Sequence, residues 1–296
     1  MFSQKDICAI LVTYYPQEHL EERLKNVLCQ VDQAVIIDNY SPEPYAQSLK
    51  KTASDFGANL IVNSQNLGIA TALNQGLNYA RLRGYKWALT LDQDSIVRPH
   101  LVEACIDAYR ECGYRNLVGL IGSNFREKHT GKTLVKENRF KGKSWAESKM
   151  IITSGSLMSI PIFDKVGPFR DDYFIDMVDF EYCMRLRTKG YKVIITSHIG
   201  MDHPIGAKGT CKAFNKRLEI SSCSPIRNYY RCRNSIIMAR EYFWEDPLWA
   251  LKRAALPAKD LARACCIEDN KTLRLKYIFM GLYHALILKQ GELDES

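Results

Sequence analysis

Residues 88–95 read ALTLDQDS, an apolar, strand-forming run that stops at two aspartates separated by one glutamine. A short apolar run of this kind predicts a buried strand. Asp92 and Asp94 then stand at the end of the strand, where two carboxylates this close can share one Mg²⁺ or Mn²⁺ ion. Two other interpretations are a plain polar turn and a phosphatase site in which Asp92 is the nucleophile.

Strands and helices alternate through the first 124 residues of the 296-residue chain. Apolar, β-branched runs predict strands at 7–15, 33–41, 58–64, 85–95 and 116–124, and helical spacing predicts helices at 20–31, 46–56, 68–84 and 100–112. Strand character returns at 152–160. The alternation indicates an α/β domain with a mainly parallel central sheet and helices on both faces. The strand that ends at Asp92 is then the fourth. A phosphatase nucleophile usually follows the first strand of its domain, so this position counts against a phosphatase.

Polar residues follow these strands where a ligand would bind. In parallel sheets ligands bind beyond the carboxyl ends of the strands, and Thr13, Asp38, Asn63 and Asp92 all lie at those ends. Residues 66–70 open the next helix, whose backbone N–H groups could meet a phosphate. The sequence has no G-x-G-x-x-G after its first strand and no G-x-x-x-x-G-K-[ST], which argues against a dinucleotide dehydrogenase and a P-loop enzyme.

A second acidic cluster lies at residues 176–181. Asp179 stands just before a predicted helix, so it either caps the free N–H groups of that helix or acts as a general base that the helix N-terminus keeps ionised. His203 follows a strand predicted at 191–197 and offers an imidazole as a third metal ligand, with His198 as a competing candidate.

The C-terminal third of the chain is basic. Residues 203–290 carry 16 lysines and arginines against 7 acidic residues, and the whole chain has a net charge of +8. From residue 207 the pattern is helical and aromatic, so the sequence predicts a catalytic domain at 1–206 and a helical, basic segment at 207–296. Such a segment suits membrane headgroups or a lipid-linked phosphate, although a solvated helical face gives the same pattern. No nucleic-acid-binding motif is present in the sequence.

The spacing of the cysteines and the lengths of the apolar runs indicate where in the cell the protein is found. The ten cysteines are irregularly spaced and include no C-x-x-C pair, which predicts reduced thiols and a cytosolic chain. The N-terminal region lacks the apolar stretch of a signal peptide. The longest later apolar run, 277–288, is too short to span a bilayer.

Eight segments, taken in order, resemble glycosyltransferase family 2, and within it the bacterial rhamnosyltransferase-like members. They are LVTYYP (11–16), VIIDNYS (35–41), NSQNLGIATALNQG (63–76), LTLDQDS (89–95), ITSGSLMSI (152–160), FIDMVDFEYCMRL (174–186), HPIG (203–206) and RNYYRCRN (227–234). The resemblance implies a GT-A fold, a nucleotide-sugar donor, a divalent cation (Mg²⁺ or Mn²⁺) and inversion at the anomeric carbon.

The resemblance also implies roles for individual residues. Asp179 would be the catalytic base, and Asp94 and His203, with Asp92, would bind the metal. The residues expected to contact or border the nucleotide sugar or acceptor are Thr13, Tyr15, Asp38, Asn66, Gly68, Asn74, Ser154, Gly155 and Glu181. In the basic segment we expect contacts to a lipid diphosphate or to headgroups from Arg227, Tyr230 and Arg233, with Trp244 and Trp249 at the membrane interface.

Three positions depart from the usual pattern of the family. Tyr15 and Tyr40 stand where Asn and Gly are usual, and Val178 stands where many members have an acid. An apolar residue at that last position resembles the rhamnosyltransferase-like members. The resemblance therefore implies transfer of L-rhamnose from dTDP-rhamnose, or alternatively of a sugar from UDP or GDP, onto a lipid-linked O-antigen or capsule intermediate. This would take place at the inner face of the bacterial inner membrane. A non-catalytic binder of anionic surfaces is disfavoured because the acidic residues and the histidine are all present.

Overall fold

The structure is a computed structural model, and it describes residues 2–16, 19–204, 207–213, 216–266 and 268–293. The chain divides into two compact units. The sheet unit comprises Met1–Phe169 and Tyr182–Pro204, and the helical unit comprises Arg170–Glu181 and Ile205–Ser296. The sequence pattern predicted one boundary at 206/207. It did not predict that the segment carrying Asp179 is grouped with the C-terminal helices.

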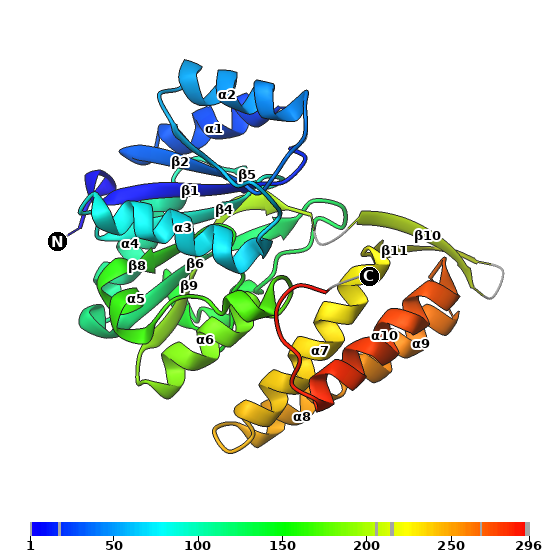
Figure 1. The fold of residues 1–296 in the computed structure, drawn as a ribbon. Coiled ribbons are helices and arrows are strands. Elements are labelled where there is room, and N and C mark those ends of the chain that lie inside the picture. Colours follow the sequence, from blue (N-terminus) through cyan, green and yellow to red (C-terminus); the bar gives the residue numbers. More distant parts are fainter. Residues whose placement is uncertain (1, 17–18, 205–206, 214–215, 267, 294–296) are drawn as a thin grey trace. The chain divides into compact units, whose positions relative to one another are not determined.

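Nine described strands form the sheet, in the order β3-β2-β1-β4-β8-β6-β9-β5, with β7 paired to β9 (Figure 1). The strands are β1 Ile7–Thr13, β2 Gln33–Asp38, β3 Asn59–Val62, β4 Trp87–Asp92, β5 Ile96–Val97, β6 Val118–Glu127, β7 Trp145–Glu147, β8 Ser156–Ser159 and β9 Lys192–His203. The helices up to residue 188 are α1 Leu20–Leu28, α2 Tyr45–Asp55, α3 Gly68–Leu82, α4 Leu101–Glu111, α5 Ile160–Val166 and α6 Val178–Thr188.

The predicted parallel arrangement is present in the first half of the sheet. β1 pairs in parallel with β2 and with β4, and β2 pairs in parallel with β3. The register sets Thr13 opposite Asp38 and Val12 opposite Asp92, so the carboxyl ends of these strands are level. β8 runs antiparallel to both β4 and β6, which makes the second half mixed.

Helices pack on both faces of the sheet because successive strand residues point to opposite sides. On one face, Ile7, Ala9 and Leu11 join a buried cluster with residues of α1, α2 and α4. On the other face, α3 approaches β1 so closely that a Cβ on Gly76 would lie 2.3 Å from Cγ2 of Ile10. A larger residue at position 76 would therefore push α3 off the sheet. Both faces are covered, as the alternating pattern predicted.

Two boundaries in the sheet unit differ from the sequence prediction. β9 was predicted to end at residue 197 but continues to His203, because it pairs with β6 as far as Glu127. Residues 152–160 were predicted as one strand, whereas β8 covers only Ser156–Ser159 and α5 follows at once. In both cases the pairing partner sets the end of the strand, and the partner is distant in sequence.

The C-terminal part of the helical unit begins with two strands, where the sequence predicted helix. β10 (Ala207–Ala213) and β11 (Lys216–Ser222) form an antiparallel pair, with Ala207 opposite Ser222. The alternation of apolar and polar residues in RLEIS (217–221) is a strand signal that the helical interpretation overlooked. The prediction was therefore wrong for residues 207–222 and right for the helices α7 Pro225–Glu241, α8 Pro247–Ala254, α9 Leu256–Cys266 and α10 Lys271–Leu286.

The core of the helical unit forms around α7 and α10. Tyr229 and Tyr230 of α7 are almost fully buried. A Cβ on Gly281 of α10 would lie 2.5 Å from the backbone oxygen of Tyr229, so the two helices pack backbone to backbone at this point. Among the helices that the structure describes, none has both the length and the apolar character needed to cross a bilayer.

Candidate functional site

Asp92, Asp94 and His203 form a cluster at one edge of the sheet. One ligand atom from each lies within 4.8 Å of the others. Asp92 ends β4, Asp94 lies in the turn before β5, and His203 ends β9. Nδ1 of His203 is 3.7 Å from Oδ1 of Asp94. The structure thus brings together the three residues predicted to bind the metal. It does not bring His198 there, since Nε2 of that residue lies 3.2 Å from the backbone oxygen of Pro99.

Two serines hold this cluster in place. Oγ of Ser95 lies 2.8 Å from Nδ1 of His203 and 2.7 Å from Oγ of Ser154. Oγ of Ser154 accepts a hydrogen bond from the backbone N–H of Asp92 at 3.0 Å. Hydrogen bonds of this kind orient the side chains that ligate a metal. Ser154, predicted to border the sugar, is almost fully buried and supports Asp92, whereas the role of Ser95 was not predicted.

One oxygen in the cluster has no hydrogen-bonding partner in the part of the chain that the structure describes. Oδ1 of Asp94 is buried, and the described residues offer it no hydrogen-bond donor. A buried, unpaired carboxylate oxygen is costly in free energy and calls for a compensating group. A divalent cation bound by two carboxylates and an imidazole would supply that compensation. The donor set therefore fits the predicted cation.

Gln93, between the two aspartates, ties their turn to the end of β1. Its side-chain oxygen accepts from the backbone N–H of Tyr14 at 2.8 Å, and its amide nitrogen donates to the backbone oxygen of Tyr14 at 2.9 Å. The guanidinium of Arg23 also donates to the backbone oxygen of Gln93. No sequence signal pointed to this role, because glutamine carries no special preference for such a turn.

Asp38, predicted for the nucleotide pocket, is engaged by the protein itself. It is fully buried and accepts hydrogen bonds from Oγ1 of Thr13 (3.0 Å), from Oγ of Ser41 (2.6 Å) and from the backbone N–H of Ser41 (2.9 Å). Oγ of Ser41 also accepts from the backbone N–H of Tyr15 at 2.9 Å. Asp38 therefore holds the loop after β1 in place, directly through Thr13 and indirectly through Ser41. The side chain of Tyr15 remains accessible to a ligand.

The tyrosines of these loops are exposed and have unusual backbones. Tyr15 and Tyr40 have φ values of 51° and 77°, in a region that non-glycine residues rarely adopt. The two residues are 46% and 55% exposed. The nearby hydroxyl of Tyr14 raises the pKa of Tyr15. Exposed aromatic rings held by a strained backbone are typical of a ligand-binding loop.

A chain of amides follows at the ends of β2 and β3. Nδ2 of Asn63 donates to Oδ1 of Asn39 (3.0 Å), and Nδ2 of Asn39 donates to Oδ1 of Asn66 (2.7 Å). Oδ1 of Asn66 also accepts from the backbone N–H of Gly68 at 3.0 Å. Asn66 and Gly68 thus lie together at the start of α3, as predicted.

Two other predicted residues have internal partners. The amide of Asn74 bridges the backbone N–H and oxygen of Phe169, at 2.9 Å each. Gly155 has φ of 70°, and a Cβ there would lie 2.6 Å from the sulfur of Met201. Its backbone donates to the oxygen of Thr90 at 2.8 Å. These contacts account for Asn74 and Gly155 without a bound sugar.

Asp179 lies in the first turn of α6 and belongs to the helical unit. It is half-buried, and its Oδ1 accepts from the backbone N–H of Phe180 at 2.9 Å. Burial lowers the pKa of the Arg253 guanidinium, and the negative charge of Asp179 acts in the opposite direction. A nearby cation favours the ionised carboxylate that a base requires.

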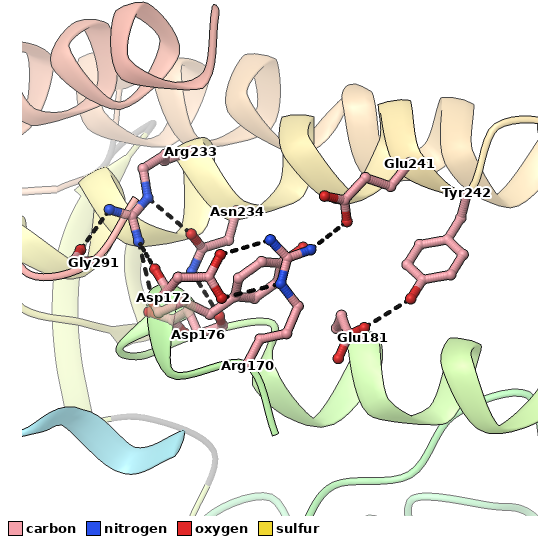
Figure 2. Close-up of polar contacts among 10 residues, drawn as sticks. Arg170, Asp172, Asp176, Glu181, Arg233, Asn234, Glu241, Tyr242 and Gly291 are labelled. Carbon is pink, nitrogen blue, oxygen red and sulfur yellow. Dashed lines mark hydrogen bonds and ion pairs between the residues drawn. The ribbon is translucent and has the colours of Figure 1, made fainter. Parts of the chain in front are cut away.

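The remaining predicted contacts of the helical unit are mostly internal (Figure 2). Glu181 is buried and accepts a hydrogen bond from Oη of Tyr242 at 2.7 Å. Arg233 is fully buried, and the hydroxyl of Tyr230 accepts from the backbone N–H of Leu293 at 2.9 Å. These positions correct the expectation that Tyr230 and Arg233 meet a lipid phosphate, because neither side chain reaches the surface.

Arg227 and the two tryptophans predicted to meet the membrane differ in how exposed they are. The side chain of Arg227 is 42% exposed but forms an ion pair with Asp176 at 2.7 Å. Trp249 is buried, which corrects its assignment to a membrane interface, whereas Trp244 is 87% exposed. The exposed candidates for an interface are therefore fewer than the sequence suggested.

Comparison with known proteins gives a consistent result. The model of Glycosyl transferase family 2 matches residues 8–166. The dTDP-rhamnosyl transferase RfbF of Shigella flexneri is 30% identical over 249 residues, which is 80% of either chain. Mannosyltransferase PcManGT from Pyrobaculum calidifontis has a TM-score of 0.60 at 15% identity, over 96% of this chain and 88% of that chain.

A second solved structure, S. aureus TarS 1-349 in complex with UDP-GlcNAc, has a TM-score of 0.61 at 14% identity, over 94% of this chain and 81% of that chain. A longer TarS chain has a TM-score of 0.55, and this chain spans 39% of its length. These structural likenesses confirm the predicted GT-A fold. Together with the match over residues 8–166 and the identity to RfbF, they show that the chain belongs to glycosyltransferase family 2.

Proposed function

We propose that this glycosyltransferase moves L-rhamnose from dTDP-rhamnose to a hydroxyl of a lipid-linked polysaccharide intermediate of the O-antigen or capsule type, with inversion at the anomeric carbon. The identity to RfbF, a dTDP-rhamnosyl transferase, supports the donor. The observation that carries the chemistry is the cluster of Asp92, Asp94 and His203, in which a buried oxygen of Asp94 finds no hydrogen-bond donor among the described residues. A cluster of two carboxylates and an imidazole is suited to hold a nucleoside diphosphate through a cation.

Asp94 and His203, with Asp92, would hold Mg²⁺ or Mn²⁺. Mannosyltransferase PcManGT was solved with GDP-Man and Mn²⁺, which supports the choice of ion. When bound, such a cation supplies positive charge that offsets the charge developing on a departing diphosphate. Ser95 and Ser154 keep the ligands oriented, and Gln93 keeps their turn beside the end of β1.

In this proposal Asp179 removes the proton from the acceptor hydroxyl as its oxygen attacks the anomeric carbon. Its place in the first turn of a helix and the nearby Arg253 both favour the charged carboxylate. The loops after β1 and β2, with Thr13, Tyr15 and Asp38, would hold the nucleobase and ribose. The accessible ring of Tyr15 is the group best placed among these for stacking.

Thermal unfolding with a panel of nucleoside diphosphates tests the donor. With Mn²⁺ or Mg²⁺ present, we expect saturating dTDP to raise Tm by about 5 °C, because a ligand that binds only the folded state stabilises it. UDP and GDP should raise it less. A larger shift with UDP or GDP would overturn the rhamnose assignment and favour a different nucleotide sugar.

We also propose that the helical unit contacts the inner face of the bacterial inner membrane. Trp244, Leu248 and Leu251 are 87%, 74% and 57% exposed, and Lys252 follows them on the surface. An exposed apolar group beside basic residues suits an interface with anionic lipid. The excess of basic residues in 203–290 supports the same partner.

Flotation with anionic liposomes tests this contact. Leu248→Glu should lower the partition coefficient for the liposomes by roughly tenfold, because it removes an apolar side chain from the lipid and adds a negative charge. Leu82→Glu is the matched control, since Leu82 of α3 is also 74% exposed but belongs to the sheet unit. Equal flotation of the two variants would contradict a membrane contact through Leu248.

A further inference from the structure

The segment before Asp179 has an unusual backbone. Phe174, Asp176 and Met177 have φ values of 60°, 62° and 65°. The backbone of a non-glycine residue rarely adopts a positive φ. Three such residues within four positions persist only where the surrounding structure imposes this conformation. α6 begins at Val178, so this backbone determines where Asp179 emerges.

One buried amide holds this backbone in place (Figure 2). Nδ2 of Asn234, on α7, faces the backbone oxygens of Tyr173 (2.9 Å), Ile175 (2.9 Å) and Asp176 (3.0 Å). Oδ1 of Asn234 accepts from Nε of Arg233 at 3.0 Å. Because a guanidinium only donates, this contact fixes which end of the amide faces the segment. Asn234 is fully buried, so water does not compete for these bonds.

Arg233 extends the same attachment. Its Nη2 donates to the backbone oxygens of Asp172 (2.9 Å) and Tyr173 (3.3 Å). Its Nη1 donates to the backbone oxygen of Gly291 at 2.6 Å, and the N–H of Gly291 donates to the oxygen of Asp172 at 2.8 Å. The segment is therefore bonded both to α7 and to the stretch of chain near Gly291.

Further contacts lie on either side of Asp179 in the chain. Before it, Arg227 binds Asp176 through two hydrogen bonds of 2.7 and 3.1 Å, and this carboxylate raises the pKa of Arg227. After it, the hydroxyl of Tyr242 donates to Glu181 at 2.7 Å. α7 and the residue that follows it thus anchor the chain both before and after Asp179.

We infer that Asn234 and Tyr242 are positioning residues for sugar transfer, and that they act by fixing the backbone that presents Asp179. The inference rests on the proposed function, in which Asp179 is the base. Asn234 acts through the backbone of residues 173–176, and Tyr242 acts through Glu181. Neither is a catalytic residue in this scheme. The helical unit, on this view, contributes to the reaction by holding the base as well as by any contact with lipid.

Amide hydrogen exchange of the full-length protein tests the anchoring directly. Asn234→Ala should accelerate amide exchange in residues 172–181, because the backbone oxygens of this segment lose the hydrogen bonds that the Asn234 amide donates to them. Ser235→Ala is the matched control: Ser235 is equally buried on α7, but its hydroxyl donates to the backbone oxygen of Cys232 within the helix. Unchanged exchange in residues 172–181 of Asn234→Ala would overturn the inference, whatever the role of Asp179.

A double-mutant cycle tests the link to Asp179. Asn234→Ala alone should lower kcat by about 10²-fold, the size expected for a small misplacement of a reacting group, while KM for the donor stays near the wild-type value. In the Asp179→Asn background the same substitution should cause no further loss, because there is no base left to position. Losses that multiply would show that Asn234 acts independently of Asp179 and would overturn the inference.

A milder variant covers the case in which Asn234→Ala does not fold. Tyr242→Phe keeps the ring and removes only the hydroxyl, and kcat should fall by roughly 3–10-fold, again with no further loss in Asp179→Asn. Wild-type kcat in Tyr242→Phe would overturn the role of Tyr242. If Asp179→Asn alone retains turnover, the proposed base is wrong, and the exchange experiment still decides whether Asn234 anchors the segment.

Discussion

The Asp179→Asn variant is expected to bind the donor nucleotide as tightly as the wild type and to lose sugar transfer by about 10²–10⁴-fold or more. Asparagine keeps the oxygen that accepts from the backbone N–H of Phe180 at 2.9 Å, so the start of α6 should be preserved. It cannot take up the proton of an acceptor hydroxyl. Steady-state turnover, together with calorimetric titration of dTDP, separates the two effects.

Asp171→Asn is the matched control for that experiment. Asp171 is exposed, lies in the same segment of the helical unit, Arg170–Glu181, and loses the same charge on substitution. Its turnover should stay close to that of the wild type. Near-wild-type turnover in Asp179→Asn would instead remove Asp179 from the role of base and leave the cation site as the main contributor to catalysis.

The second large effect is expected from Asp94→Asn. The substitution removes the charge from the carboxylate whose Oδ1 is buried without a hydrogen-bond donor among the described residues. We expect affinity for Mn²⁺ to fall by about 100-fold or more, since even residues that only support a ligand typically contribute 10–100-fold. Transfer should fall by about 10²–10³-fold, as when a group that stabilises developing charge is lost. Electron paramagnetic resonance of Mn²⁺ measures binding without reference to turnover.

Asp107→Asn controls for a general loss of negative charge. Asp107 lies on α4, where its exposed carboxylate pairs with Arg110 at 3.1 Å. Its substitution should leave Mn²⁺ affinity unchanged. If Asp94→Asn also binds Mn²⁺ like the wild type, the cluster of Asp92, Asp94 and His203 is not the cation site, and the unpaired oxygen needs another explanation.

Much of the sheet unit followed from local patterns in the sequence. The strands β1 to β4 and β6 and the helices α1 to α4 appeared where periodicity placed them, because burial is encoded in the spacing of apolar residues. The two-residue strand β5 was not predicted. The hairpin β10–β11 was missed, since its strand signal is short and lies within a stretch judged helical. α5 was missed because it is short and continues directly from β8.

The three residues of the cluster were predicted from the sequence, but the residues that support them were not. The three cluster residues could be named because strand ends of a parallel sheet meet at one edge. Gln93, Ser95 and Asn234 could not, because glutamine, serine and asparagine are common in turns and helices and carry no distinctive pattern. Arg233 was assigned to the surface because arginine is seldom fully buried. In the structure its buried guanidinium donates hydrogen bonds to the backbone oxygens of Asp172, Tyr173 and Gly291.

The sequence by itself determined the order of strands and helices, the positions of the acidic residues and the family resemblance, because each depends on residues close together in the chain. Only the tertiary structure decided which polar side chains face a ligand and which hold the fold. Gln93 contacts Tyr14 across 79 residues, and Asn234 contacts Ile175 across 59. Whether a buried polar group is free or already satisfied depends on such distant partners, and only the folded chain brings them together.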